Sequence, residues 1–130
     1  MSCSTYFWIA SPHAAPSTRV WAAVETGKVE GLLAAHAITT IHYLVRKEQG
    51  SSAARRNIAA LLQVFGVAPV DREVIRRALE LPWPDFEDAV TATAARAAGC
   101  DGIVTRDPRG FPHPPVRVFT PEAAAAILMQ

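Results

Sequence analysis

The sequence predicts a three-layer α/β/α domain with a central parallel sheet, and three observations support this fold class. Short apolar runs of strand length alternate with longer segments whose apolar residues recur at helical spacing. One or two predicted helices separate successive strands, and parallel neighbours need such a crossover connection. The chain has 130 residues, half of them hydrophobic, so we expect one domain over residues 1–130.

The first quarter of the chain supplies two predicted strands and one helix. The apolar run at residues 6–9 predicts a buried strand that is short or degenerate, and Ser11-Pro12 ends it. Helix-start residues at 16–18 then open a helix that stops at Gly27. A second buried strand is expected at residues 31–35.

Two helices and a short strand are predicted next. Apolar residues at helical spacing indicate a helix from Ala37 to the polar run before Gly50. Ser51 or Ser52 can cap the following helix, with Gly66 as its terminal glycine. A short strand at residues 67–70 follows.

The last part of the chain is expected to contain three helices and two strands. Asp71 caps a helix that runs through Glu80, and residues 81–84 form a turn. Asp85 opens a helix that closes at Gly99. Strands at residues 102–105 and 116–119 and an alanine-rich helix from Pro121 complete the domain.

Composition limits the classes of function. Alanine supplies 24 of the 65 hydrophobic residues, so 41 larger apolar side chains build the core, and alanine clusters mark close helix packing. The net charge of +1 lacks the basic excess of most duplex DNA binders. Cys3 and Cys100 form neither a disulfide framework nor a zinc motif. Without an apolar membrane span or a signal peptide, we expect a cytoplasmic protein.

Three aspartates are predicted to lie at one edge of the sheet. Ligands of parallel sheets bind beyond the carboxyl ends of the strands, where crossover helices also begin. Asp107 directly follows strand 102–105, and Asp85 and Asp88 occupy the first turn of helix 85–98. Asp101 precedes the strand and is expected at the opposite edge.

Carboxylates at this spacing favour a divalent cation. Acids brought together raise each other's pKa unless a cation or hydrogen-bond donors balance them. An all-oxygen ligand set favours Mg²⁺ or Mn²⁺ over zinc. Such an ion polarises a phosphoryl oxygen and activates water, so a phosphodiester is the natural substrate class.

Structural alternatives compete for the same residues. Asp85 has the position of a helix cap, with Asp88 at the third helical position. Asp107-Pro108-Arg109-Gly110 also fits a type I turn. His36 and His42 do not share a helix face, and the remaining histidines lie in loops. The helical arginines fit a solvated face or an acidic partner as well as RNA; they are Arg55, Arg56, Arg72, Arg76 and Arg77.

The motifs as a set resemble those of the PIN domain, in particular the VapC-type toxin ribonucleases. The most specific are DFEDAV at residues 85–90 and IVTRD at residues 103–107, with Phe111 after them. Weaker likeness extends to residues 27–31, 39–44 and 120–122. The resemblance spans about Pro12 to the end and favours Asp88 and Asp107 as metal ligands.

The resemblance implies a nuclease that cuts single-stranded RNA with Mg²⁺ or Mn²⁺ held by four acids. Asp88 and Asp107 match two of the four, and Asp85 lies beside them. The family's first-strand aspartate would fall one or two positions before Met1. Thr39, Thr40 and His42 occupy the stretch of the early-helix glutamate. The predicted site is therefore open on one side.

The expected function is that of an endoribonuclease, the toxin of a toxin–antitoxin pair. Its expected partners are an RNA substrate, a cognate antitoxin protein and a second copy of the chain. Two alternatives stay open: a non-catalytic or N-terminally truncated PIN-like interaction module, and a DNA-repair or RNA-processing nuclease outside toxin systems.

Overall fold

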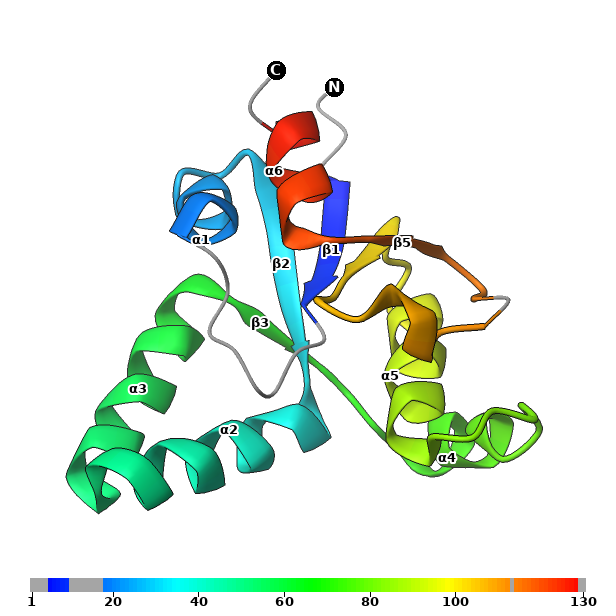
Figure 1. Cartoon of the computed structure of the whole chain (residues 1–130), viewed down its shortest axis with the longest axis horizontal. Helices are drawn as coiled ribbons and strands as arrows, with labels where there is room; N and C mark the ends of the chain where they lie inside the picture. The colour runs from blue at the N-terminus through cyan, green and yellow to red at the C-terminus, as the bar shows by residue number, and fades with distance from the viewer. Residues whose placement is uncertain (1–4, 10–17, 113, 129–130) are drawn as a thin grey trace.

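Five parallel strands form the central sheet of the computed structural model, which describes residues 5–9, 18–112 and 114–128 (Figure 1). The strands follow the order β3-β2-β1-β4-β5 across the sheet. Their bounds are β1 (Thr5–Ile9), β2 (Val29–Ala34), β3 (Gly66–Ala68), β4 (Gly102–Val104) and β5 (Arg117–Phe119). β1 lies at the centre, because its backbone pairs with β2 from Thr5 to Ile9 and with β4 from Phe7 to Ile9.

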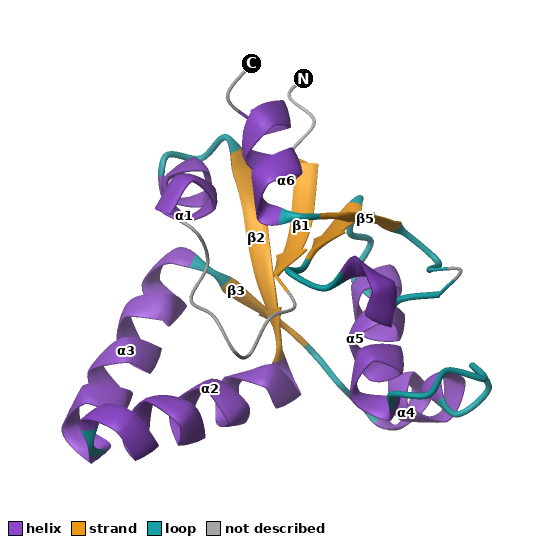
Figure 2. Cartoon of the chain, in the orientation of Figure 1, coloured by secondary structure: helices purple, strands orange, loops and turns teal. Residues whose placement is uncertain are grey.

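Helices connect the strands and cover both faces of the sheet (Figure 2). They are α1 (Thr18–Glu25), α2 (Ala35–Gln49), α3 (Ser51–Val64), α4 (Arg72–Ala78), α5 (Phe86–Ala97) and α6 (Pro121–Leu128), with a 3₁₀ turn η1 (Pro108–Gly110). Every element predicted from the sequence exists. The boundaries differ most at β2, which starts at Val29 and passes into α2 at Ala35 without a loop.

Successive strand residues belong to two separate cores. Ile103 packs with α4 and α5 on one face, whereas Val104 packs with α1, α3 and α6 on the other. Ala34 and Leu33 divide between the same two cores. This alternation of side chains across the sheet confirms the three-layer α/β/α architecture.

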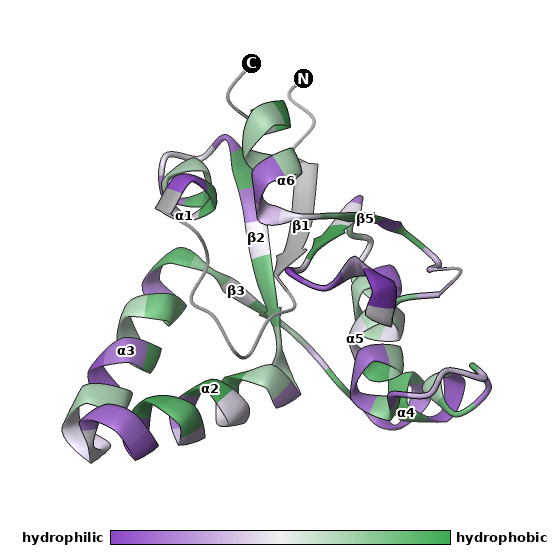
Figure 3. Ribbon diagram, in the orientation of Figure 1, coloured by the Kyte–Doolittle hydropathy of each residue, from purple (hydrophilic) through white to green (hydrophobic). Residues whose placement is uncertain are grey.

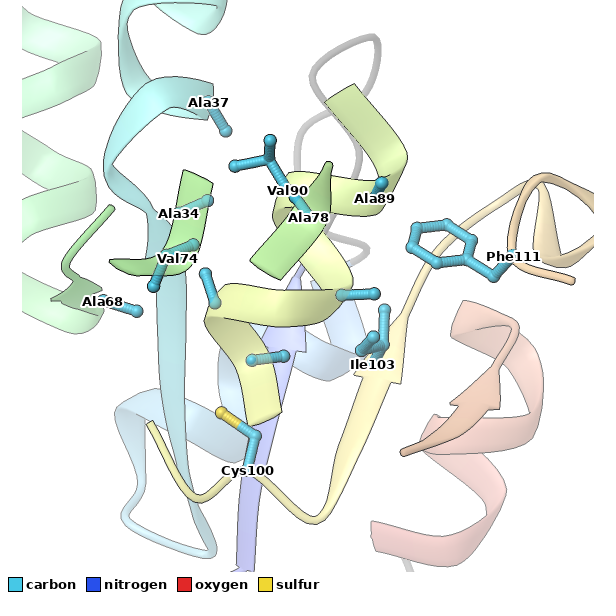
Figure 4. Packing of buried hydrophobic residues seen from close by; sticks show 13 residues of the cluster. Ala34, Ala37, Ala68, Val74, Ala78, Ala89, Val90, Cys100, Ile103 and Phe111 are labelled. Atoms are coloured by element: carbon cyan, nitrogen blue, oxygen red, sulfur yellow. The ribbon is translucent and has the colours of Figure 1, made fainter. Parts of the chain in front are cut away.

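Alanine dominates the core between α5 and the sheet (Figure 4). Ala89, Ala92, Ala94 and Ala95 are each at most 1% exposed, and Val90 is the largest buried aliphatic residue of α5. Small side chains let a helix backbone approach its neighbours closely. The alanine cluster of α5 therefore does mark close helix packing, whereas Ala59 and Ala60 of α3 are exposed.

Two capping predictions are confirmed and two are wrong. Asp71 and Asp85 cap α4 and α5 through their side chains. The predicted serine cap of α3 does not form, because α2 ends only at Gly50, which itself occupies the cap position. Gly66 is not the terminal glycine of α3: Phe65 takes an extended conformation, and Gly66 already pairs with β2.

Helices α2 and α3 form an arm that extends from the sheet (Figures 1 and 3). They pack against each other, yet α2 buries only Ala37 and α3 only Ala54 and Leu61. Tyr43 and Leu62 are about half exposed on this arm. Within the described ranges, no helix is both long and apolar enough to cross a membrane.

Candidate metal centre

The candidate centre lies beyond the carboxyl end of β4, beside the first turn of α5. Thr105 follows β4 and is 4% exposed, and its backbone N–H donates to the Phe119 carbonyl at 2.9 Å. This bond continues the pairing of β4 with β5 and places Asp107 at the predicted edge. Asp101 precedes β4 at the other end of the strand, as expected.

Asp85 is the N-cap of α5. Its side chain Oδ1 accepts a hydrogen bond from the Asp88 backbone N–H at 3.1 Å. An N-cap acceptor satisfies one of the helix's free N–H groups and fixes where the helix begins. The capping interpretation of Asp85 is therefore confirmed, and its role as a metal ligand stays a prediction.

Asp88 is half-buried and lies against the backbone of Gly110. A Cβ atom built on Gly110 would lie 2.7 Å from Asp88 Oδ2, which is closer than real Cβ atoms approach other atoms. The Asp88 carboxylate thus occupies the space that a side chain at position 110 would need, and it would have to turn aside for one. Sequence reasoning about a turn glycine did not reveal this contact.

Asp107 begins the turn that carries Gly110. The Gly110 N–H donates to the Asp107 carbonyl at 3.1 Å, so the turn predicted for residues 107–110 does form. The Asp107 N–H donates to Thr105 Oγ1 at 3.2 Å. These bonds hold the backbone only, and the carboxylate lies 3.7 Å from the exposed Arg109 Nε. The turn is compatible with a ligand role for Asp107.

Three neighbouring acids and partial burial raise the pKa of Asp88 to about 6. Removal of water from the carboxyl group is the largest cause, followed by the charges of Asp85, Glu87 and Asp107. The charge of Asp107 acts on Asp88 although the two residues lie on different elements. The structure thus brings these predicted ligands into one electrostatic cluster that a cation would stabilise.

An aromatic pair joins the two segments that carry the acids. The ring of Trp83, just before α5, meets Phe111 edge to face with centroids 5.8 Å apart. Phe111 is 4% exposed and belongs to the core of α5. The pair fixes η1 against the start of α5, which holds Gly110 near Asp88. Phe111 therefore has a positioning role.

His36 connects the start of α2 to the first turn of α5. Its Nε2 lies 3.2 Å from Thr91 Oγ1, and this hydroxyl donates to the Glu87 carbonyl at 3.0 Å. Burial lowers the pKa of His36, and its buried Nδ1 has no hydrogen-bond partner among the described residues. Sequence reasoning dismissed His36, although its place directly after β2 puts it at the functional edge.

The donor set fits a weakly held, water-rich divalent ion. Mg²⁺ commonly uses one or two protein carboxylates together with waters and substrate phosphates, and Asp88 with Asp107 offers two. Among the residues that the structure describes, no group of three or more His, Cys, Asp or Glu could hold a metal. Thr39, in the stretch of the expected glutamate, donates its hydroxyl to the His36 carbonyl instead.

The turn expected at Ser11-Pro12 lies outside the described residues.

The sequence profile of the PIN domain family matches residues 5–109 of the chain. This span includes β4 and the three aspartates of the candidate centre, Asp85, Asp88 and Asp107. No curated protein sequence matches the chain significantly.

Three solved structures share the fold at low sequence identity. VapC20 of Mycobacterium tuberculosis, described as a sarcin-ricin loop cleaving toxin, is 19% identical with a TM-score of 0.57, covering 76% of this chain and 87% of its own. VapBC2 of Rickettsia felis, bound to a promoter DNA fragment, is 11% identical with a TM-score of 0.69 and coverages of 89% and 98%. FitAB, bound to a DNA fragment, is 19% identical with a TM-score of 0.64 and coverages of 88% and 94%.

Proposed function

Because this chain belongs to the PIN domain family, whose profile matches residues 5–109, we propose that it is a metal-dependent endoribonuclease. The observation that carries the proposal is the cluster of acids at the carboxyl end of β4, where burial first, and then the charges of Asp85, Glu87 and Asp107, raise the pKa of Asp88 to about 6. A half-buried carboxylate among other acids at a sheet edge is typical of a cation site. We expect the catalytic domain to span residues 1–130.

Asp88 and Asp107 would hold Mg²⁺ or Mn²⁺, and Asp85 stands next to them as a further candidate ligand. When bound, the ion supplies a polarised phosphoryl oxygen and a more acidic water for hydrolysis of the RNA phosphodiester. In the metal-free protein the pKa of the half-buried Asp88 carboxyl is about 6, so at acidic pH the ion would have to displace a proton from this group. Arg109, whose side chain is 96% exposed beside Asp107, supplies positive charge for a substrate phosphate.

We also assign the chain to a toxin–antitoxin system, as its toxin. The support is structural: two of the similar structures are the toxin–antitoxin complex VapBC2 and the FitAB complex. The proposed partners are a cognate antitoxin protein and a second copy of the chain. The proposed location is the cytoplasm, where an RNA substrate is available.

A non-catalytic interaction module is the second candidate function. The observation that favours it is the small ligand set, because the described part of the chain brings no group of three metal-ligating side chains together. Such a module would keep the antitoxin partner and lose hydrolysis. The two functions differ in whether Asp107 contributes to RNA cleavage.

An RNA cleavage assay with Mg²⁺ or Mn²⁺ tests the enzyme directly. We expect Asp107→Asn to lower cleavage at least about 100-fold, because it removes one of two charged metal ligands. Asp101→Asn is the matched control, since Asp101 lies at the opposite end of β4 and should keep wild-type activity. Equal activity of the wild type and Asp107→Asn would contradict the proposal.

Thermal unfolding with Mn²⁺ tests the metal site without catalysis. Binding to the folded state alone raises the unfolding temperature, so we expect a rise for the wild type and for Asp101→Asn. Asp88→Asn should lose it. A wild type that Mn²⁺ does not stabilise at millimolar concentration would favour the interaction module.

A further inference from the structure

A cavity lies between α4, α5 and the segment before β5. Its volume is about 270 Å³, and four charged residues line it: Arg76 and Arg77 from α4, Glu80 after α4, and Arg96 from α5. Leu81 and Pro115 supply apolar wall. Neither the carboxylates of the candidate metal centre nor the Trp83–Phe111 pair takes part in it.

Glu73 and Glu80 neutralise only part of the positive charge of the three arginines around the cavity. Arg76 donates to Glu73 and Glu80, and Arg77 donates its Nε to Glu73 at 3.0 Å. The terminal nitrogens of Arg77 stay outside these bonds. Arg96 makes no ion pair within the part of the chain that the structure describes, and its side chain is exposed. The Arg96 guanidinium group and the terminal nitrogens of Arg77, whose Nε is paired with Glu73, are therefore available to an anion.

Compensation of the helix dipoles is an alternative role for these arginines, but it does not explain why they surround one cavity. Basic residues in the last turn of a helix compensate its dipole, and all three arginines occupy such positions. The dipole of each helix does not require arginines of both helices to face one hollow, however. Thr93 in the cavity wall is 8% exposed, and its hydroxyl donates to the Ala89 carbonyl at 2.8 Å. The Thr93 oxygen thus adds no negative charge, and the charged lining of the cavity consists of three arginines and Glu80.

The chemistry of the Arg96 guanidinium group and the terminal nitrogens of Arg77 favours a phosphate ester with a terminal phosphate. A guanidinium group donates two parallel hydrogen bonds to an oxyanion. A terminal phosphate carries three strong acceptor oxygens and up to two negative charges, so it can accept from Arg77 and Arg96 together. A carboxylate has two oxygens and is satisfied by one guanidinium group. The apolar wall can contact the sugar of the ester.

We propose that the cavity between α4 and α5 binds a terminal phosphate of a nucleotide, with Arg96 and Arg77 as its anion ligands. The phosphate belongs either to a free nucleoside 5′-monophosphate or to the 5′ end of an RNA strand. The RNA source rests on the proposed ribonuclease function, whereas the free nucleotide does not. Arg96 is about 12 Å along α5 from Asp88, by the rise of a helix, so the site is distinct from the metal centre.

Binding of labelled RNA in EDTA tests the site without cleavage. Two oligonucleotides of one sequence, one with a 5′-phosphate and one with a 5′-hydroxyl, are compared by fluorescence anisotropy at low salt, with adenosine 5′-monophosphate titrated separately by calorimetry. We expect the wild type to bind at least one phosphorylated probe, and Arg96→Gln to weaken that binding about fivefold. Arg56→Gln is the matched control, because it removes the same charge from exposed α3.

The outcomes distinguish the two sources from each other and from failure. A preference for 5′-phosphorylated over 5′-hydroxyl RNA that Arg96→Gln abolishes and Arg56→Gln keeps supports the RNA end. Binding of the monophosphate alone, lost in Arg96→Gln, supports the free nucleotide. Absence of both effects in the wild type overturns the proposal, as do equal losses in Arg96→Gln and Arg56→Gln. None of these results depends on cleavage, so a failure here leaves the ribonuclease proposal to its own assay.

Discussion

The fold makes the carboxyl group of Asp88 harder to ionise than that of an aspartate in water. Its carboxyl group is partly removed from water and faces the charges of Asp85, Glu87 and Asp107. In metal-free protein this arrangement costs stability once Asp88 ionises, because the folded state holds the proton more tightly than the unfolded chain does. Under the proposed function, a cation bound by Asp88 and Asp107 would offset this loss of stability.

The pKa of Asp88 predicts a pH-dependent effect of Asp88→Asn. The pKa is about 6 in the folded protein against an ordinary value of 3.8. The folded wild type therefore keeps its full stability below the lower value and loses some as the pH rises towards 6. After allowance for solvent exposure, Asp88→Asn should be more stable by about 1 kcal/mol near neutral pH in EDTA. Urea unfolding of both proteins, repeated at acidic pH, should show the gap narrow.

The control for this effect is Asp101→Asn, at the other end of β4. It should follow the wild type at every pH. A stability gap for Asp88→Asn that stays constant down to acidic pH would show that the charge of Asp88 is not its cause.

Gly110 lies against the carboxylate of Asp88. A methyl group at residue 110 would meet Asp88 Oδ2 at 2.7 Å, and the carboxylate would have to turn aside. Because this oxygen ends a flexible, half-buried side chain, we expect a cost below the roughly 1–3 kcal/mol of overpacking in a core. The two residues should therefore be coupled energetically.

A double-mutant cycle measures this coupling. We expect Gly110→Ala to destabilise the wild type by about 0.5–1 kcal/mol and to have little effect in the Asp88→Ala protein, where the carboxylate is gone. Urea unfolding of the four proteins gives the coupling free energy. Equal costs in both backgrounds would mean that the contact does not restrict residue 110.

At the scale of elements, α5 joins the core to the metal centre. Its first turn carries Asp85 and Asp88, and its middle packs on the sheet through alanines that are nearly inaccessible to solvent. Trp83 and Phe111 then attach η1 to the same helix. The position of the acids thus depends on how closely α5 approaches β4.

Ala92→Leu tests this close approach. Ala92 is 0% exposed, so three added carbon atoms would push α5 from the sheet and cost about 1–3 kcal/mol. The Mn²⁺-dependent rise in unfolding temperature should shrink as well, because the Asp88 end of the helix moves. Ala97→Leu, at an exposed position of the same helix, should change stability by less than about 0.5 kcal/mol. Similar costs for the two substitutions would contradict the close packing.

At the scale of the whole molecule, the arm of α2 and α3 suggests where a second copy binds. Its two helices bury few of their own side chains and leave Tyr43 52% and Leu62 51% exposed. Exposed apolar side chains on a weakly buried arm are typical of association surfaces. We therefore place the proposed dimer contact there.

Sedimentation equilibrium tests the dimer. We expect a mass twice the 14.0 kDa of the chain and a shift towards the monomer for Tyr43→Glu, because a buried unpaired charge opposes association. Leu79→Glu is the control, since Leu79 is 68% exposed on the far side of the molecule at the end of α4. Dissociation by Leu79→Glu instead would place the contact elsewhere, and a monomeric wild type would remove the dimer from the proposal.

Local patterns determined the elements and the family of this chain. Apolar runs and helical spacing predicted each strand and helix, because both signals arise within a few neighbouring residues. Asp85 and Asp71 were predicted as caps for the same reason. The DFEDAV and IVTRD motifs indicated the PIN domain, and the fold and the profile match confirm it.

Only the tertiary structure decided which residues from distant segments meet. The sequence places Asp88 and Gly110 22 residues apart, and no local rule shows that one carboxylate fills the space beside the other backbone. The same holds for His36 with Thr91, and for Arg76 and Arg77 with Arg96. The two wrong predictions for α3 have a related cause. Continuation of α2 to Gly50 overrode the serine cap, and pairing with β2 overrode the role of Gly66 as terminal glycine. Propensity acts along the chain, whereas the sites of this protein lie where separate elements pack.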